Sequence, residues 1–71
     1  MIPYNNPNGG IEGYEIGEDF IRIFFKGGGT YVYSNKSCGS SVVDTMIALA
    51  DSDDKLTTFI NQHKPRYESK S

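Results

Sequence analysis

The sequence predicts a small α+β domain, in which a three-stranded antiparallel β-meander is followed by one or two C-terminal helices packed on one face. Two apolar runs rich in β-branched and aromatic residues flank three consecutive glycines at positions 27–29, which is the pattern of a β-hairpin. Apolar residues then recur at helical spacing over residues 43–50 and again over residues 56–63. A chain of 71 residues has room for one such domain.

The strands are predicted from alternation along the chain. Residues 11–16 form a short first strand, and a turn at 17–18 leads into a second strand at 19–26. A third strand follows at 30–34, so the three segments indicate an antiparallel meander. In the second strand two sets of residues alternate, as in a sheet with two different faces: Ile21, Ile23 and Phe25 against Arg22, Phe24 and Lys26.

Two helices are predicted after the strands. Residues 35–40 form a polar loop, and Ser41 and Asp44 then have the spacing of a capping box. The acidic run at 51–54 ends the first helix and supplies caps for the second, which begins near Lys55. Pro65 closes that helix because proline cannot continue it. One face of the first helix is predicted to hold Val43, Met46, Ile47 and Ala50. Leu56, Phe59, Ile60 and His63 lie on one side of the second helix, with His63 partly exposed at the helix end.

The two ends of the chain are predicted to lie outside the domain. Residues 1–10 contain two prolines, three asparagines and two glycines, which is the composition of a flexible loop. Residues 66–71 have no apolar pattern and are predicted to form a tail. The domain is therefore placed at residues 11–65.

The length of the glycine turn decides which face of the sheet the tyrosines occupy. A two-residue turn at 27–28, the register favoured here, pairs Phe24 with Tyr31 and places the tyrosines on the side of Phe24. A loop of all three glycines places Tyr31 and Tyr33 on the opposite face, since a slip of one residue exchanges the faces. Both registers stay open at this point.

The favoured register creates an aromatic face with basic residues, and this face is the predicted recognition surface. Sheet-surface RNA binders use such faces to stack unpaired bases. Tyr and Arg are also enriched at protein interfaces. Cross-strand aromatic pairs that only stabilise the sheet would give the same pattern. The residues of the predicted surface are Arg22, Phe24, Lys26, Tyr31 and Tyr33.

Composition favours a protein partner over a nucleic acid. The formal net charge is −2, whereas non-specific nucleic-acid binding depends on neutralising phosphates with Lys and Arg. The basic residues Lys64, Arg66 and Lys70 are spaced out, with Glu68 among them. We therefore expect a small non-enzymatic interaction module that binds a protein partner or a second copy of itself. Weak binding of single-stranded RNA is the alternative.

Residues able to support catalysis or hold a metal ion are few. Cys38 and His63 are the sole members of their types, and a thiol nucleophile with a His base would need them within hydrogen-bonding reach. The acidic run at 51–54 lacks the distal Glu and the Gly turn of a calcium loop. Because the glycines at 27–29 lie between two strands, a phosphate-binding loop is not indicated. We expect no catalytic residues, no metal and no cofactor.

Cellular context is predicted from what the sequence does not contain. A single cysteine suits a reducing compartment. The first residues lack the basic and apolar regions of a signal peptide, and the longest apolar run is far shorter than the ~20 residues that span a bilayer. We therefore expect a cytoplasmic protein with no membrane partner.

The chain resembles the KTSC domain, a small domain found at the C-terminus of some lysyl-tRNA synthetases and as a stand-alone bacterial protein. The residues that carry the resemblance are Gly13-Tyr14, Ile21, Ile23, Phe25, Gly28, Tyr31, Tyr33, Ala50, Ser52 and Tyr67. The sequence departs from the family pattern at residues 35–38, where a Val-Pro is expected, and at Asp54, where a Gly is expected. The resemblance implies the fold described above and a connection with RNA, without an established activity.

Overall fold

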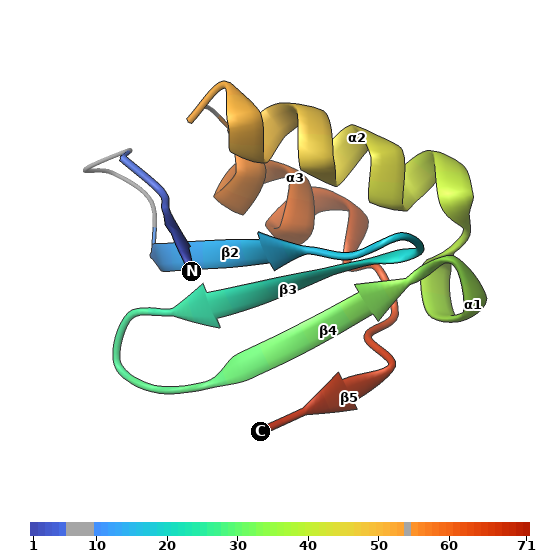
Figure 1. Cartoon of the computed structure of the whole chain (residues 1–71), viewed down its shortest axis with the longest axis horizontal. Coiled ribbons are helices and arrows are strands. Elements are labelled where there is room, and N and C mark those ends of the chain that lie inside the picture. Colours follow the sequence, from blue (N-terminus) through green and yellow to red (C-terminus); the bar gives the residue numbers. More distant parts are fainter. Residues whose placement is uncertain (6–9, 54) are drawn as a thin grey trace.

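The computed structural model describes residues 1–5, 10–53 and 55–71, and it shows an antiparallel sheet with helices beside it (Figure 1). The sheet has five strands in the order β1-β2-β3-β4-β5, so strands that follow one another in sequence are neighbours in the sheet. The α+β class is confirmed, but the described residues form five strands instead of three. The strands are β1 (Ile2–Pro3), β2 (Ile11–Ile16), β3 (Phe20–Phe25), β4 (Thr30–Ser34) and β5 (Ser69–Lys70), and the helices are α1 (Asn35–Cys38), α2 (Ser40–Asp51) and α3 (Leu56–His63).

The N-terminal segment contributes a strand and a core residue, which corrects the prediction of a loop at residues 1–10. β1 pairs with β2, and Pro3 is tolerated there because an edge strand does not need every backbone N–H. Tyr4 is buried, and its hydroxyl oxygen accepts a hydrogen bond from the backbone N–H of Leu56 at 3.2 Å. Residues 6–9, which belong to the same predicted loop, lie outside the described residues.

The C-terminal segment forms the other edge of the sheet, which corrects the prediction of a tail at residues 66–71. In β5, Ser69 pairs with Val32 of β4. Beyond it, Ser71 and Thr30 exchange backbone hydrogen bonds of 2.7 and 2.9 Å. A strand of two residues is too short to show alternation in a sequence, and this explains why both edge strands were missed.

The hydrophobic core joins the sheet to α2 and α3. Figure 1 shows these two helices on the same side of the sheet. The predicted helical spacing is confirmed in part, since Val43, Met46 and Ala50 are buried whereas Ile47 is partly buried. The buried hydrophobic residues come from both layers. Those of the sheet and the segment after β1 are Tyr4, Ile11, Tyr14, Ile21, Ile23 and Tyr33, and those of the helices are Val43, Met46, Ala50 and Leu56.

The β3–β4 hairpin has a different register from the favoured one. Phe24 pairs with Thr30, so the predicted pairing of Phe24 with Tyr31 is wrong by one residue. Both tyrosines of β4 therefore lie on the helix side, where Tyr33 is buried and Tyr31 packs against the core. Burial of aromatic surface favours this register, because a register is set by the face that must be covered.

The turn of the hairpin is a three-residue loop at 26–28. The N–H of Phe25 donates to the carbonyl oxygen of Gly29 at 2.9 Å, which closes the loop. The φ angles of Gly27 and Gly28 are +88° and +93°, a region that residues with a Cβ rarely adopt. The two-residue turn at Gly27 and Gly28 is thus corrected, and the glycines act as turn residues as expected.

The helix caps also differ from those predicted. Residues 35–40 contain the one-turn helix α1, which begins with a capping box between Ser34 and Ser37. The N-cap of α2 is Gly39, so the predicted box at Ser41 is wrong. A helix of four residues is too short for a periodic pattern, so neither α1 nor its capping box was predicted.

The N-cap residue of α3 is not one of the predicted acidic residues. Its N-cap is Lys55, with a φ of +60° and no side-chain cap, and Asp54 of the predicted caps lies outside the described residues. Asp51 instead accepts a hydrogen bond from the buried Tyr14 hydroxyl at 3.3 Å. Asp53 accepts one from the N–H of Asn5 at 3.1 Å. These carboxylates tie the N-terminal part of the chain to the helix layer.

Candidate functional site

Within the described residues, one face of the sheet carries no helix (Figure 1). The side chains of β3 and β4 that point away from the core lie opposite one another in the ladder, in the pairs Phe20–Ser34, Arg22–Val32 and Phe24–Thr30. Their neighbours along the strands, such as Ile21, Ile23 and Tyr33, are in the core. We call the surface formed by these three pairs the helix-free face.

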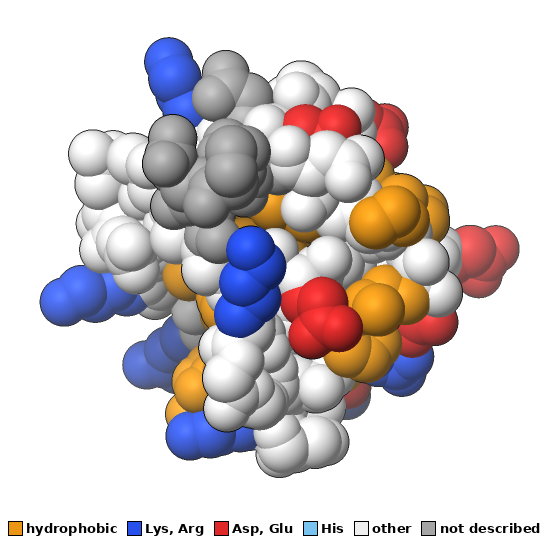
Figure 2. All heavy atoms as spheres, turned by 90° about the vertical axis from the view of Figure 1, so that its left-hand side faces the viewer, with side chains coloured by type: hydrophobic (Ala, Val, Ile, Leu, Met, Phe, Trp, Pro, Cys, Tyr) orange, Lys and Arg blue, Asp and Glu red, His pale blue; other side chains and the backbone are white. Residues whose placement is uncertain are grey.

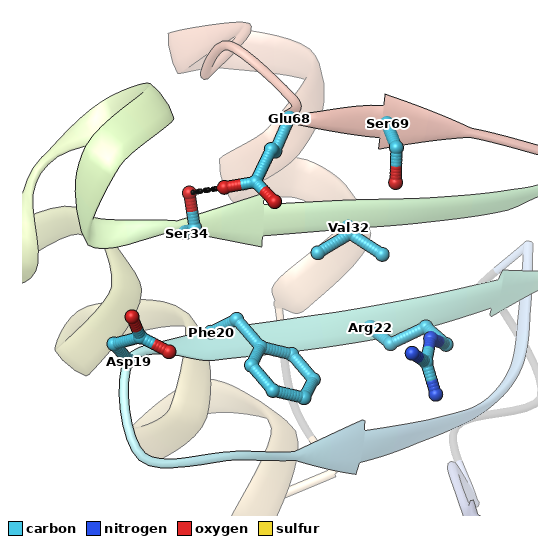
Figure 3. Close-up of a pocket in the computed structure, with 7 residues that line it drawn as sticks. All are labelled: Asp19, Phe20, Arg22, Val32, Ser34, Glu68 and Ser69. Carbon is cyan, nitrogen blue, oxygen red and sulfur yellow. Dashed lines mark hydrogen bonds between the residues drawn. The ribbon is translucent and has the colours of Figure 1, made fainter.

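A groove of about 240 Å³ lies on the helix-free face. Figure 3 shows its side chains, which come from the start of β3, from β4 and from the segment that leads into β5. We call it the sheet groove, and its lining residues are Asp19, Phe20, Arg22, Val32, Ser34, Glu68 and Ser69. The groove therefore depends on β5, because that strand brings Glu68 and Ser69 beside β4.

The apolar part of the groove is formed by Phe20 and Val32. The ring of Phe20 lies against Gly17, where a Cβ would come within 2.0 Å of a ring carbon. Gly17 is needed for this close approach, because a side chain at this position would collide with the ring. The guanidinium carbon of Arg22 lies 5.6 Å from the centre of the same ring, within the range of a cation–π contact.

The basic end of the groove is Arg22, and its charge is already paired. Its Nη1 lies 2.6 Å from Oε1 of Glu15 on β2, a strand that neighbours β3. The two residues stand opposite one another in the ladder, where a pair of unlike charges stabilises the sheet. The guanidinium is therefore held along the sheet by Glu15.

The acidic end of the groove holds Asp19 and Glu68. Figure 3 shows their carboxylates on opposite sides of the groove, with that of Glu68 turned toward Ser34. The buried hydroxyl of Ser34 donates to Oε1 of Glu68 at 2.7 Å. Within the described residues, the ion pairs are those of Glu15 with Arg22 and with the Met1 amino group, so neither Asp19 nor Glu68 is neutralised by a cation there.

The structure separates the residues of the predicted recognition surface. Arg22 and Phe24 lie on the helix-free face. Tyr33 is 3% exposed in the core, Tyr31 packs on the helix side, and Lys26 is exposed in the turn. The single aromatic face expected from the two-residue turn is therefore absent from this part of the chain, and the physical reason is the one-residue difference in register.

A second cleft, of about 320 Å³, lies on the helix side between the hairpin and α3. The ring of Tyr31 meets Phe25 edge-on at 5.1 Å and Tyr67 edge-on at 4.9 Å, and Nζ of Lys70 lies 5.4 Å from its centre. Burial raises the pKa of Tyr33 to about 12, with a smaller contribution from Tyr31. We call this site the aromatic cleft, and it is lined by Phe25, Gly28, Tyr31, Tyr33, Ile60 and Asn61.

Sequence reasoning missed most of the sheet groove. Glu68 and Ser69 were placed in a tail, and two residues of strand leave no periodic signal. Ser34 was placed in a strand without a role, although it is polar and 3% exposed. The available signal was Ser34 followed three residues later by Ser37, which is the spacing of a cap.

The residues considered for thiol chemistry have separate partners. The thiol of Cys38 contacts the carbonyl oxygen of Ser34 at 3.4 Å, at the end of α1. His63 is exposed, and its ring stacks on Phe59 with 4.3 Å between the centroids. No group of three or more His, Cys, Asp or Glu side chains that would suit a metal ion occurs among residues 1–5, 10–53 and 55–71.

The surface charge is mixed on the side of the molecule that carries the β3–β4 turn. Figure 2 shows Lys and Arg side chains mainly toward the left and lower edges of this view, and Asp and Glu mainly toward the top and right. The chain as a whole has 7 basic and 9 acidic residues. Neither sign of charge dominates this view, which is unlike the basic stripe of a typical nucleic-acid binder.

Comparisons of the chain with protein-family models, with curated proteins and with solved structures found no match. The helices of the described residues are all too short or too polar to cross a membrane.

Proposed function

We propose that the protein is a small non-enzymatic interaction module that binds a protein partner through the sheet groove. The observation that carries the proposal is a groove of about 240 Å³ on the helix-free face, with apolar side chains in its middle and charged ends. Phe20 and Arg22 are of the residue types that protein interfaces favour. A groove of this kind offers a partner both shape and charge to recognise.

The charges of the groove favour a protein over a nucleic acid. Asp19 and Glu68 line it and would repel a phosphate backbone, which needs Lys and Arg for neutralisation. The guanidinium of Arg22 is already paired with Glu15 at 2.6 Å. Nucleic-acid binding would have to overcome this arrangement.

A second candidate function is binding of single-stranded RNA beside the aromatic cleft. Tyr67 is 49% exposed, and Lys70 lies over the ring of Tyr31. An exposed ring beside a cation can stack a base and attract a phosphate. This candidate uses the side of the sheet opposite to the groove, so variants can tell the two apart.

The resemblance to the KTSC domain is part of the proposal. The residues that carry the resemblance have structural roles that a family pattern would preserve. At Gly13 there is no room for a Cβ beside the carbonyl oxygen of Ile2, and Tyr14 is buried and donates a hydrogen bond to Asp51. Tyr31 and Tyr67, which are far apart in the sequence, are in ring contact.

Size-exclusion chromatography with light scattering, at low and at high salt and with and without oligouridine, tests the proposed function. We expect oligouridine to leave the elution unchanged at both salt concentrations. A shift at low salt that is lost at high salt would contradict the proposal, and its loss in Tyr67→Ala would select the second candidate. If the protein elutes as a salt-tolerant dimer that Val32→Asp dissociates, the partner is a second copy held through the sheet groove.

A further inference from the structure

We infer that the sheet groove receives a cationic side chain, Arg or Lys, presented by the partner protein. The inference rests on the proposed function and names the chemical group that the groove would recognise. It follows from the order of the groove's residues along its length: two carboxylates at one end, apolar surface in the middle and a paired guanidinium at the other end.

The acidic end supplies the charge. Asp19 and Glu68 are both exposed, and they face the groove from opposite sides (Figure 3). No Lys or Arg of the described residues forms an ion pair with either of them. An incoming cation would therefore gain two charge-assisted contacts without first displacing a cation of this chain.

The position of the Glu68 carboxylate is set before any ligand arrives. Its Oε1 accepts the Ser34 hydroxyl hydrogen at 2.7 Å, and Ser34 is held in turn because its Oγ accepts the N–H of Ser37 at 3.1 Å. Ser34 is 3% exposed, so this support is fixed within the fold. The second carboxylate oxygen of Glu68 is left to contact a ligand, and preorganisation of this kind lowers the entropic cost of binding.

The apolar middle matches the stem of a long cationic side chain. Arg and Lys lay their methylene groups along apolar surface and keep the charged head at a polar end. Val32 and the ring of Phe20 form such a surface next to the two carboxylates. A small inorganic cation would leave this surface uncovered, whereas an arginine or lysine side chain would cover it.

The other end of the groove gives the bound side chain a direction. Arg22 is kept there by Glu15, and its positive charge disfavours a second cation beside it. The head of an incoming Arg or Lys would therefore point away from Arg22 and toward Asp19 and Glu68. Its backbone would lie nearer to Arg22, where a carbonyl oxygen can accept a hydrogen bond from the guanidinium.

The test compares two fluorescent peptides. In the first, arginine alternates with threonine or serine, and in the second, its twin, citrulline replaces each arginine. Citrulline keeps the length and shape of arginine and removes its charge. Fluorescence anisotropy with the full chain should show the arginine peptide binding at least ~10-fold more tightly than its twin, as expected for charge-assisted contacts. The double variant Asp19→Asn, Glu68→Gln should weaken arginine-peptide binding by a similar factor.

A matched control separates the groove from the general negative charge of the protein. Asp44→Asn removes one carboxylate from the exposed surface of α2, on the other side of the sheet, and should leave the affinity unchanged within about 2-fold. Glu68→Gln can still accept the hydrogen bond of Ser34, so the fold is retained in the test variant.

Three outcomes would overturn the inference. Equal affinity for the two peptides would mean that the groove binds without using a cation, which leaves the proposed function standing. Equal loss in Asp44→Asn and in the groove variants would assign the binding to overall charge. A failure of both peptides to bind would also overturn the inference. The proposed function would then be tested separately, by the chromatography with oligouridine.

Discussion

Gly13 lies where any side chain would collide with the N-terminal strand. A Cβ at this position would lie 2.7 Å from the backbone carbonyl oxygen of Ile2 and 2.6 Å from a side-chain carbon of Met1. The Met1 side chain can move, but the carbonyl oxygen can move only together with β1. A glycine at this position therefore allows β1 to pair with β2.

We predict that Gly13→Ala destabilises the protein by about 1–3 kcal/mol, because β1 must shift away from β2. Gly10→Ala is the matched control, since a Cβ there meets no atom within 4 Å, and its effect should stay within about 0.5 kcal/mol. Urea denaturation followed by circular dichroism measures both variants. Equal stability of the two would show that β1 does not restrict Gly13.

Burial of Tyr33 makes the stability of the protein depend on pH. Its pKa is raised from 10.0 to about 12, mainly because burial disfavours the phenolate. The folded protein therefore keeps a proton between pH 10 and 12 that the unfolded chain has lost, and the free energy of unfolding falls as the pH rises through this window. At about 1.4 kcal/mol per pKa unit, the loss amounts to roughly 2–3 kcal/mol.

We predict that Tyr33→Phe removes most of this alkaline loss of stability, leaving a smaller slope. Tyr14 accounts for the remainder, since burial first and the nearby Asp51 second raise its pKa as well. Tyr67→Phe is the control, because Tyr67 is 49% exposed. Urea unfolding midpoints at several alkaline pH values measure the slope, and a wild-type slope in Tyr33→Phe would contradict the burial of this phenol.

At the scale of elements, the side chain of one serine, Ser34, caps helix α1. Ser34 Oγ accepts the N–H of Ser37 at 3.1 Å, the N–H of Ser34 donates to Ser37 Oγ at 3.0 Å, and Ser34 Oγ also donates to Glu68 at 2.7 Å. One side chain thus caps a helix and holds the segment that leads into β5. Ser37 of α1 adds a second link to the same segment, since its hydroxyl donates to the carbonyl oxygen of Arg66 at 2.8 Å.

Ser34→Ala should cost about 1–2 kcal/mol of stability, because it removes the cap of α1 and leaves the half-buried N–H of Ser37 without this partner. Ser41→Ala, at the position where the sequence predicted the cap, should change stability by less than about 0.5 kcal/mol, since Ser41 is exposed. Thermal unfolding of the two variants compares them directly. If Ser41→Ala were the more damaging change, the capping assignment would be wrong.

The elements that the sequence predicted are those with enough residues for a period. β2, β4 and α3 begin within a residue of their predicted positions, because alternation or helical spacing extends over five or more residues in each. β1, α1 and β5 have two to four residues, and tertiary contacts rather than local pattern determine them. The sheet groove was the hardest part to predict, because two of its residues belong to these short elements: Ser34 caps α1 and Glu68 precedes β5.

At the scale of the whole molecule, the function depends on which face of the sheet the helices cover. Val32 belongs to the helix-free face, beside Arg22, only because the turn has three residues rather than two. Periodicity could establish that the two faces differ, but it could not choose between registers that differ by one residue. The choice is made by the joint burial of Tyr33 with the residues of α2 and α3.

The small size of the chain explains why one face remains without a helix. Two helices of twelve and eight residues cover one side of the sheet, and the 71-residue chain has no further long helix within its described part to cover the other. The exposed edge of the sheet is shortened at β5, where the strand has two residues. A partner that filled the sheet groove would bury the apolar surface of Phe20 and Val32.

The most direct test of the central claim is an NMR measurement of intermolecular nuclear Overhauser effects between the arginine peptide and the isotopically labelled protein. If the peptide binds in the sheet groove, we expect contacts from arginine methylene protons to the methyl groups of Val32 and to the ring of Phe20. Contacts to the rings of Tyr31 and Tyr67 instead would place the ligand at the aromatic cleft, on the other side of the sheet, and would contradict the assignment of the sheet groove as the binding site.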